Sequence, residues 1–139
     1  MIDKILQWNV KGYRARKQEL SLILKEQDPS CVCLQELKVP NDYQGMNPSN
    51  LYRTYCKLPT GNENNIARGG VLIAVKTTIP HSHFPLDTPL QAVAVSFPTG
   101  KLKSLCSIYL PPNINIDAID LHEIVTTLPK PTLIVGALF

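Results

Sequence analysis

The first third of the chain has the hydrophobic pattern of a strand, a helix and a second strand. Residues 4–9 and 31–37 are apolar runs of strand length, and residues 16–27 repeat apolar side chains at three- and four-residue spacing. Pro29 ends the predicted helix. Two strands joined by a crossover helix pair in parallel, so the pattern predicts a β-α-β unit.

The middle of the chain consists of strand-like segments separated by turn signals. After a loop at residues 38–50, strands are expected at residues 52–58, 71–76, 90–97 and 102–110. Residues 61–65 favour a turn, and Pro98-Thr99-Gly100 is a tight hairpin signal between the last two strands. Four consecutive strands predict an antiparallel meander.

The last part of the chain returns to helical spacing. Apolar positions predict a helix over residues 116–128, with Asn115 available as its N-cap and Pro129 directly after it. Residues 132–136 then form a final strand. The order β-α-β, β meander, α-β predicts an α/β (α+β mixed) fold in which helices pack against sheet.

Length and composition are consistent with one domain or part of one. The 139 residues are 44% hydrophobic, which is enough to build a core, and no repeat, low-complexity tract or linker divides them. A buried strand at the very C-terminus is unusual, because chain ends are normally exposed. We therefore expect residues 1–139 to be the N-terminal portion of one domain that lacks its C-terminal part.

Charge and cysteine content indicate the kind of partner and the cellular compartment. The net charge of +3 is compatible with a polyanionic partner but does not require one. Cys31 and Cys33 lack zinc-site spacing, and the four cysteines fit free thiols packed in strands, as in a reducing compartment. Asp3 and Lys4 leave no room for a signal peptide, and no apolar run reaches membrane-spanning length. We expect an intracellular protein with no membrane contact.

Two strands end at polar residues that can form one site. Trp8-Asn9 closes the first predicted strand, and Gln35-Glu36 follows the apolar run of the second. Ligand sites of α/β sheets gather at the carboxyl ends of strands, so a metal-binding carboxylate is expected at Glu36. The alternatives are a solvated surface group at Glu36 and a turn residue at Asn9.

Five segments in this order carry a family resemblance. They are Ile5-Leu6-Gln7-Trp8-Asn9, Cys33-Leu34-Gln35-Glu36, Gly69-Gly70-Val71-Leu72-Ile73, Ser107-Ile108-Tyr109-Leu110-Pro111-Pro112 and Leu133-Ile134-Val135-Gly136. Together they resemble the endonuclease domain of non-LTR (LINE-type, Jockey-like) retrotransposons. That domain belongs to the endonuclease/exonuclease/phosphatase superfamily, with apurinic endonucleases and deoxyribonuclease I as relatives. The resemblance implies part of a four-layer α/β/β/α sandwich.

The resemblance also assigns roles to three residues. Glu36 matches the metal-ligand glutamate, Asn9 the asparagine of the metal and phosphate network, and Tyr109 the tyrosine that contacts the scissile phosphate. It implies Mg²⁺ or Mn²⁺ as cofactor and DNA as partner. A hard cation held by a carboxylate suits phosphodiester hydrolysis, because it neutralises charge on the phosphate and leaving oxygen. Tyr109 could instead be a core aromatic with its hydroxyl at the rim.

Basic residues follow the strand that ends at Asn9. Lys11, Arg14, Arg16 and Lys17 could line the path of a DNA backbone, with a solvated helix face as the alternative. His81 and His83 have no nearby carboxylate or cysteine in sequence, and we read both as surface residues of a loop. Gly70 is read as a turn or close backbone approach, and Gln35 as a hydrogen-bonding neighbour of the site.

The chain departs from the family after Gly136. Intact members continue with an aspartate, an apolar residue and an asparagine, whereas this sequence has Ala137, Leu138 and Phe139. The aspartate would orient or deprotonate the attacking water, and a general base is commonly worth ~10²- to 10⁴-fold in rate. A later aspartate and a terminal aspartate-histidine pair are missing as well. We therefore expect a metal-binding remnant with little or no nuclease activity.

The same departure predicts a sticky surface. The resemblance implies two sheets packed face to face, each contributed largely by one half of the domain. We therefore expect this chain to leave much of one inner sheet face uncovered, as a surface for self-association.

Three functional hypotheses follow. The first is a truncated retrotransposon endonuclease domain whose ancestral reaction is Mg²⁺-dependent DNA nicking to prime reverse transcription. The second is a non-catalytic nucleic-acid-binding or interaction module. The third is a phosphatase of the same superfamily that acts on a small substrate, for which the sequence shows no pocket motif. A DNA substrate implies a nuclear location.

Overall fold

The computed structural model describes residues 2–40, 42–59, 69–111 and 117–138, with the side chains of residues 137 and 138 left out. Eight strands and two helices lie in these ranges. In chain order they are β1 (Ile5–Asn9), α1 (Tyr13–Gln27), β2 (Cys31–Gln35), β3 (Tyr52–Lys57), β4 (Val71–Lys76), β5 (Ser82–Phe84), β6 (Gln91–Ser96), β7 (Ser104–Leu110), α2 (Ala118–Thr127) and β8 (Thr132–Leu138).

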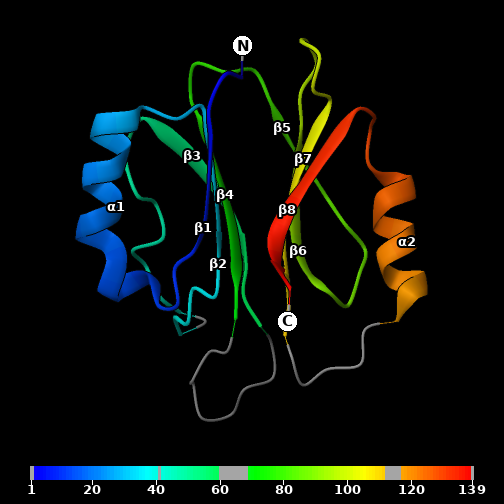
Figure 1. Cartoon of the computed structure of the whole chain (residues 1–139), viewed down its shortest axis with the longest axis horizontal. Helices are drawn as coiled ribbons and strands as arrows, with labels where there is room; N and C mark the ends of the chain where they lie inside the picture. The colour runs from blue at the N-terminus through cyan, green and yellow to red at the C-terminus, as the bar shows by residue number, and fades with distance from the viewer. Residues whose placement is uncertain (1, 41, 60–68, 112–116, 139) are drawn as a thin grey trace.

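The strands form two mixed sheets packed face to face (Figure 1). The first sheet has the order β1-β2-β4-β3 and the second β5-β6-β7-β8. β1 is parallel to β2 and β8 is parallel to β7, while the other neighbours are antiparallel. Helix α1 covers the outer face of the first sheet and α2 that of the second. The predicted α/β/β/α sandwich is confirmed.

Three apolar layers hold these elements together. Leu20 and Leu24 of α1 pack on the first sheet, and Ile124 of α2 and its C-cap Leu128 pack on the second. Between the sheets lies a third layer, formed by Cys31, Cys33, Val71, Ile73, Val75, Val93, Val95, Phe97, Leu105 and Tyr109. All five residues of β2 are buried because a helix covers one face of this strand and the second sheet the other.

The predicted meander is divided between the two sheets. β5, β6 and β7 form an antiparallel meander, but β4 lies in the first sheet, where it pairs with β2 on one side and with β3 on the other. The pairing expected between the strands at 71–76 and 90–97 does not occur. The strand β5 was missed, because a three-residue run with His83 in it has no periodic signal.

His81 and His83 occupy the flank formed by β3 and β5. The Nε2 atom of His81 lies 3.0 Å from the Tyr55 hydroxyl, and the His83 ring stacks on the Tyr55 ring with centroids 5.4 Å apart. His83 is exposed as expected, whereas His81 is half-buried. These contacts of Tyr55 with the two histidines join the first sheet to the second along this flank.

Both helices begin at residues other than those expected. α1 starts at Tyr13, one turn earlier than the apolar pattern indicates, and ends at Gln27, followed by the C-cap Asp28 with its left-handed φ of 48°. Asp117 caps α2, and its carboxylate accepts a hydrogen bond from the Ile119 amide at 2.9 Å. The expected cap Asn115 and the turn at residues 61–65 lie outside the described residues.

The expectation of an uncovered inner sheet face is wrong. Both sheets come from this chain, and their inner faces bury each other. Among the described residues, however, β1 and β8 are both edge strands, and they lie on the same flank of the sandwich. Leu133 of β8 is 38% exposed there. The self-association predicted through an uncovered sheet face therefore has no such face to use. Because unpaired apolar edges favour association, this flank is instead the surface on which we expect it.

Three of the four cysteines are buried free thiols, as the sequence predicts, and the fourth is exposed. Cys31, Cys33 and Cys106 are buried free thiols, and burial raises the pKa of Cys31 and of Cys106 to about 12. Cys56 is exposed in β3 and packs in no core layer of the described residues.

Neither described helix is long and apolar enough to cross a membrane.

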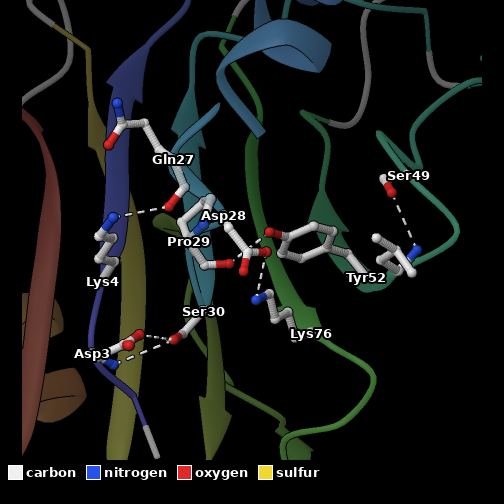
Figure 2. A network of polar contacts seen from close by, with 10 residues as sticks. Asp3, Lys4, Gln27, Asp28, Pro29, Ser30, Ser49, Tyr52 and Lys76 are labelled. Atoms are coloured by element: carbon white, nitrogen blue, oxygen red, sulfur yellow. Dashed lines mark hydrogen bonds and ion pairs between the residues drawn. The ribbon is translucent and has the colours of Figure 1, made fainter. Parts of the chain in front are cut away.

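A polar network at the turn between α1 and β2 fixes one end of the first sheet (Figure 2). It joins the Tyr52 hydroxyl to the Pro29 carbonyl oxygen (2.6 Å), Lys76 Nζ to Asp28 Oδ1 (2.6 Å), Ser30 Oγ to Asp3 Oδ1 (2.7 Å) and Lys4 Nζ to the Gln27 carbonyl oxygen (3.1 Å). The network connects β1, β3 and β4 to the helix end, at the opposite end of the strands from Asn9 and Gln35.

Removal of the Tyr52 hydroxyl should weaken the fold in a pH-dependent way. Burial, together with the negative charge of Asp28, raises the pKa of Tyr52 to about 12 from 10.0. Because the pKa of Tyr52 is higher in the folded state than in the unfolded state, its contribution to stability is fully present below pH 10. This contribution is lost as the pH rises towards 12. Tyr52→Phe should therefore be less stable than the wild type by about 1 kcal/mol at pH 8, and the difference should shrink above pH 10.

Urea unfolding midpoints of the two proteins at pH 8, 10 and 11 measure this difference. Tyr43→Phe, at a half-buried loop position, is the control for loss of a phenol. A Tyr52→Phe deficit that stayed constant up to pH 11 would contradict the interpretation.

Candidate active site

The carboxyl ends of β1 and β2 bring Asn9 and Glu36 together. The two strands are parallel neighbours with Asn9 paired to Gln35, so Glu36 follows immediately beside Asn9. The Asn9 side-chain amide donates a hydrogen bond to Glu36 Oε1 at 3.0 Å. The structure thus confirms that the polar ends of these strands meet.

Glu36 itself lies just outside β2, in an unusual conformation. Its φ is 53°, and Lys11 and Lys38 beside it also have positive φ, at 49° and 51°. The Gly12 amide donates to the Glu36 carbonyl oxygen at 2.9 Å, which ties the start of α1 to this turn. Left-handed non-glycine residues cost energy and gather at functional sites. Glu36 is 7% exposed, so the alternative of a solvated surface group does not hold.

Lys38 is a site residue that sequence reasoning missed. Its Nζ lies 3.7 Å from Glu36 Oε2 and supplies a positive charge to that carboxylate. The side chain of Lys38 is 50% exposed, so it can leave when another cation binds. Lys38 follows Glu36 by two residues, which was the one sequence signal for this contact. The backbone turn that brings the two side chains together could not be predicted from the sequence.

Tyr109 reaches the same place from the second sheet. It lies near the end of β7 and is 8% exposed. Burial, the Glu36 charge and a hydrogen bond with Glu36 raise the pKa of Tyr109. Tyr109 is therefore protonated at neutral pH, and the three residues named from sequence form one constellation across two sheets.

The loop before β4 ties the second sheet to the site. Gly70 has a φ of 95°, and its amide donates to Gln91 Oε1 of β6 at 2.6 Å. The Leu37 amide donates to the Gly70 carbonyl oxygen at 3.3 Å. A Cβ at Gly70 would contact Leu37 and Leu58 at 3.2–3.3 Å, so the close approach expected of Gly70 is confirmed.

The oxygen atoms at this site fit a hard divalent cation. Asn9 Oδ1 is buried and has no hydrogen-bond partner, and the Glu36 carboxylate lies next to it. Mg²⁺ is commonly held by one or two carboxylates, with water and substrate phosphate as further ligands. No cluster of three or more His, Cys, Asp or Glu residues occurs in the described parts of the chain, so the site offers a single-carboxylate arrangement.

The basic residues lie around the start of α1 but do not form one surface. Lys11, Arg14, Arg16 and Lys17 are all exposed. Arg14 and Lys17 share a helix face by their three-residue spacing, and the Arg14 guanidinium lies 5.9 Å from the Tyr43 ring centroid. Arg16, two residues from Arg14, points to another side of the helix. DNA binding by these residues stays a prediction.

The comparisons with known proteins identify relatives of this chain. The Endonuclease/Exonuclease/phosphatase family model matches residues 6–134. No curated protein matches the sequence significantly.

Three solved structures share the fold. An AP endonuclease from Archaeoglobus fulgidus superposes with a TM-score of 0.60 at 23% identity, over 91% of this chain and 48% of that one. A 3′ phosphatase from Neisseria bound to product DNA hairpin gives 0.62 at 20%, over 98% and 57%. The endonuclease domain of TRAS1, a telomere-specific non-LTR retrotransposon, gives 0.67 at 19%, over 98% and 60%. The chain thus spans about half of each relative.

Proposed function

This chain belongs to the endonuclease/exonuclease/phosphatase family, and we propose that it carries the metal- and phosphate-binding part of a retrotransposon-type DNA endonuclease site, with little hydrolytic activity of its own. The observation that carries the proposal is the meeting of Asn9, Glu36 and Tyr109 at the strand ends. The order of the five sequence motifs supports the retrotransposon lineage, and a DNA substrate would place the protein in the nucleus.

Each residue has a defined task in this proposal. Glu36 would hold Mg²⁺ or Mn²⁺, which supplies positive charge to the phosphate and to the leaving oxygen. Asn9 fixes the carboxylate through its amide hydrogen bond at 3.0 Å. The protonated Tyr109 hydroxyl can donate to a phosphate oxygen in place of Glu36 when substrate binds, and Lys38, Lys11 and Arg14 supply cationic charge around the turn.

Low activity is expected from the residue at position 137. Ala137 pairs with Tyr109 in the register of β7 and β8, next to the site. The family resemblance places an aspartate there, as orienter or base for the attacking water. An alanine has no titratable group, and loss of a general base commonly slows catalysis by ~10²- to 10⁴-fold.

Conversion of supercoiled plasmid to open circle tests the proposal. The purified chain should nick slowly with Mg²⁺, not at all with chelator or as Glu36→Ala, and faster as Ala137→Asp. Nicking that survives Glu36→Ala would refute the assignment of Glu36.

The alternative is a non-catalytic nucleic-acid-binding module, which the alanine at position 137 favours. Fluorescence anisotropy with a labelled duplex separates the two functions. Binding that weakens with salt but does not respond to Mg²⁺ or to Glu36→Ala, without nicking, would support the non-catalytic module.

A further inference from the structure

Three polar side chains form a layer between the sheets, directly inside the site. Gln7 of β1 and Gln35 of β2 exchange hydrogen bonds through their amides, at 2.7 and 2.9 Å. The Gln35 amide also donates to Ser107 Oγ of β7 at 2.9 Å, and Ser107 Oγ donates to the Leu34 carbonyl oxygen at 3.3 Å. The layer therefore connects the first sheet to the second by side-chain hydrogen bonds.

Each member of this layer lies next to a residue of the site. Gln35 directly precedes Glu36, while Gln7 lies two residues before Asn9 and Ser107 two residues before Tyr109. Residues two apart on a strand point to the same face, so the layer lies one step inside the site on the same inner faces. β1 and β7 carry members of both sets, and Glu36 follows β2 directly after Gln35.

The apolar layer around these hydrogen bonds makes them fix the position of one sheet relative to the other. Gln35 and Ser107 are 0% exposed, within an otherwise apolar layer between the sheets. A buried amide or hydroxyl is costly unless it is paired, whereas apolar contacts tolerate sliding of one sheet over the other. The hydrogen bonds therefore favour one position of β7 along β2, and with it one position of Tyr109 relative to Glu36.

We propose that Gln35 and Ser107 are positioning residues, which hold the second sheet in the register that places Tyr109 against Glu36. The proposal rests on the metal-binding role given to Glu36 under the proposed function, and it assigns neither residue contact with substrate or metal. Gln7 completes the layer from the exposed edge strand.

Ser107→Ala tests the role against a matched control. Ser104→Ala removes another 0% exposed serine hydroxyl from β7, one that donates to the Pro129 carbonyl oxygen at 2.6 Å, away from the site. Calorimetric titration with Mn²⁺ should show a dissociation constant about 10- to 100-fold larger for Ser107→Ala and unchanged for Ser104→Ala, since groups that orient a ligand have effects of this size. Equal Mn²⁺ affinity of both variants would overturn the proposal.

A second readout does not need the metal. The NMR resonance of the Asn9 side-chain amide, which donates to Glu36, should shift in Ser107→Ala and not in Ser104→Ala. If the wild type binds no Mn²⁺, the proposed function fails, while this resonance still decides the positioning role: a shift supports it and no shift refutes it. If Ser107→Ala does not fold, Gln7→Ala at the exposed edge should give the same changes at smaller size, and its failure to do so would also refute the proposal.

Discussion

Glu36→Gln should weaken Mn²⁺ and Mg²⁺ binding by at least about 100-fold, because even residues that only orient a ligand are worth 10- to 100-fold. The substitution replaces a carboxylate with a neutral amide of the same shape at a 7% exposed position. The carbonyl oxygen of the new side chain can still accept the hydrogen bond from Asn9, so the turn should remain folded. The lost negative charge also releases Lys38 from its contact at 3.7 Å.

Isothermal titration with Mn²⁺ measures this effect. Glu19→Gln makes the same chemical change at an exposed position of α1 and should bind as the wild type does. Wild-type affinity in the Glu36→Gln variant would show that the cation, if bound, is held elsewhere. Circular dichroism of both variants establishes that the comparison is between folded proteins.

Leu34→Ala should lower the free energy of unfolding by about 2–5 kcal/mol, the usual cost of a cavity left by a buried leucine. Leu34 is 0% exposed and packs in the layer between α1 and the first sheet. In a domain of this size the change corresponds to a fall in melting temperature of roughly 6–20 °C. The prediction concerns stability, since the Leu34 side chain packs on the α1 face of β2, opposite the inner face that carries Gln35.

Leu22→Ala is the matched control, because Leu22 lies on α1 but is 55% exposed. Its effect on the free energy of unfolding should stay within about 0.5 kcal/mol, as for most surface substitutions. Chemical unfolding followed by circular dichroism compares the two variants. Similar losses for both would mean that the α1 layer is not packed as described.

Local pattern was enough to predict most elements of the fold. The periodicity of residues 16–27 identified α1, and alternation with turn signals located the strands that became β1, β2, β3, β4, β6, β7 and β8 within a few residues. These signals are local because a strand or helix repeats its buried positions every two or about 3.6 residues. Asn9 and Glu36 were found for a related reason, since each follows an apolar run at its carboxyl end.

The choice of partners was not visible in the sequence. The runs at 71–76 and 90–97 look alike, yet β4 joins the first sheet and β6 the second. Alternation of apolar and polar residues along a strand shows which positions face the core. It does not show which other strand pairs with it. The three-residue β5 had no periodicity to detect, and the early start of α1 depends on Tyr13, whose amide bonds to the Leu37 carbonyl oxygen.

By itself the sequence determined most of the elements, their order, the polar strand ends and, through the ordered motifs, membership of the endonuclease/exonuclease/phosphatase family. Only the tertiary structure decided how the strands divide between two sheets, that Lys38 lies beside Glu36, and that Ser107 bonds to Gln35 across 72 positions of chain. The reason is physical: hydrophobic periodicity is written over neighbouring residues, whereas a hydrogen bond between sheets depends on where the whole chain places two distant strands.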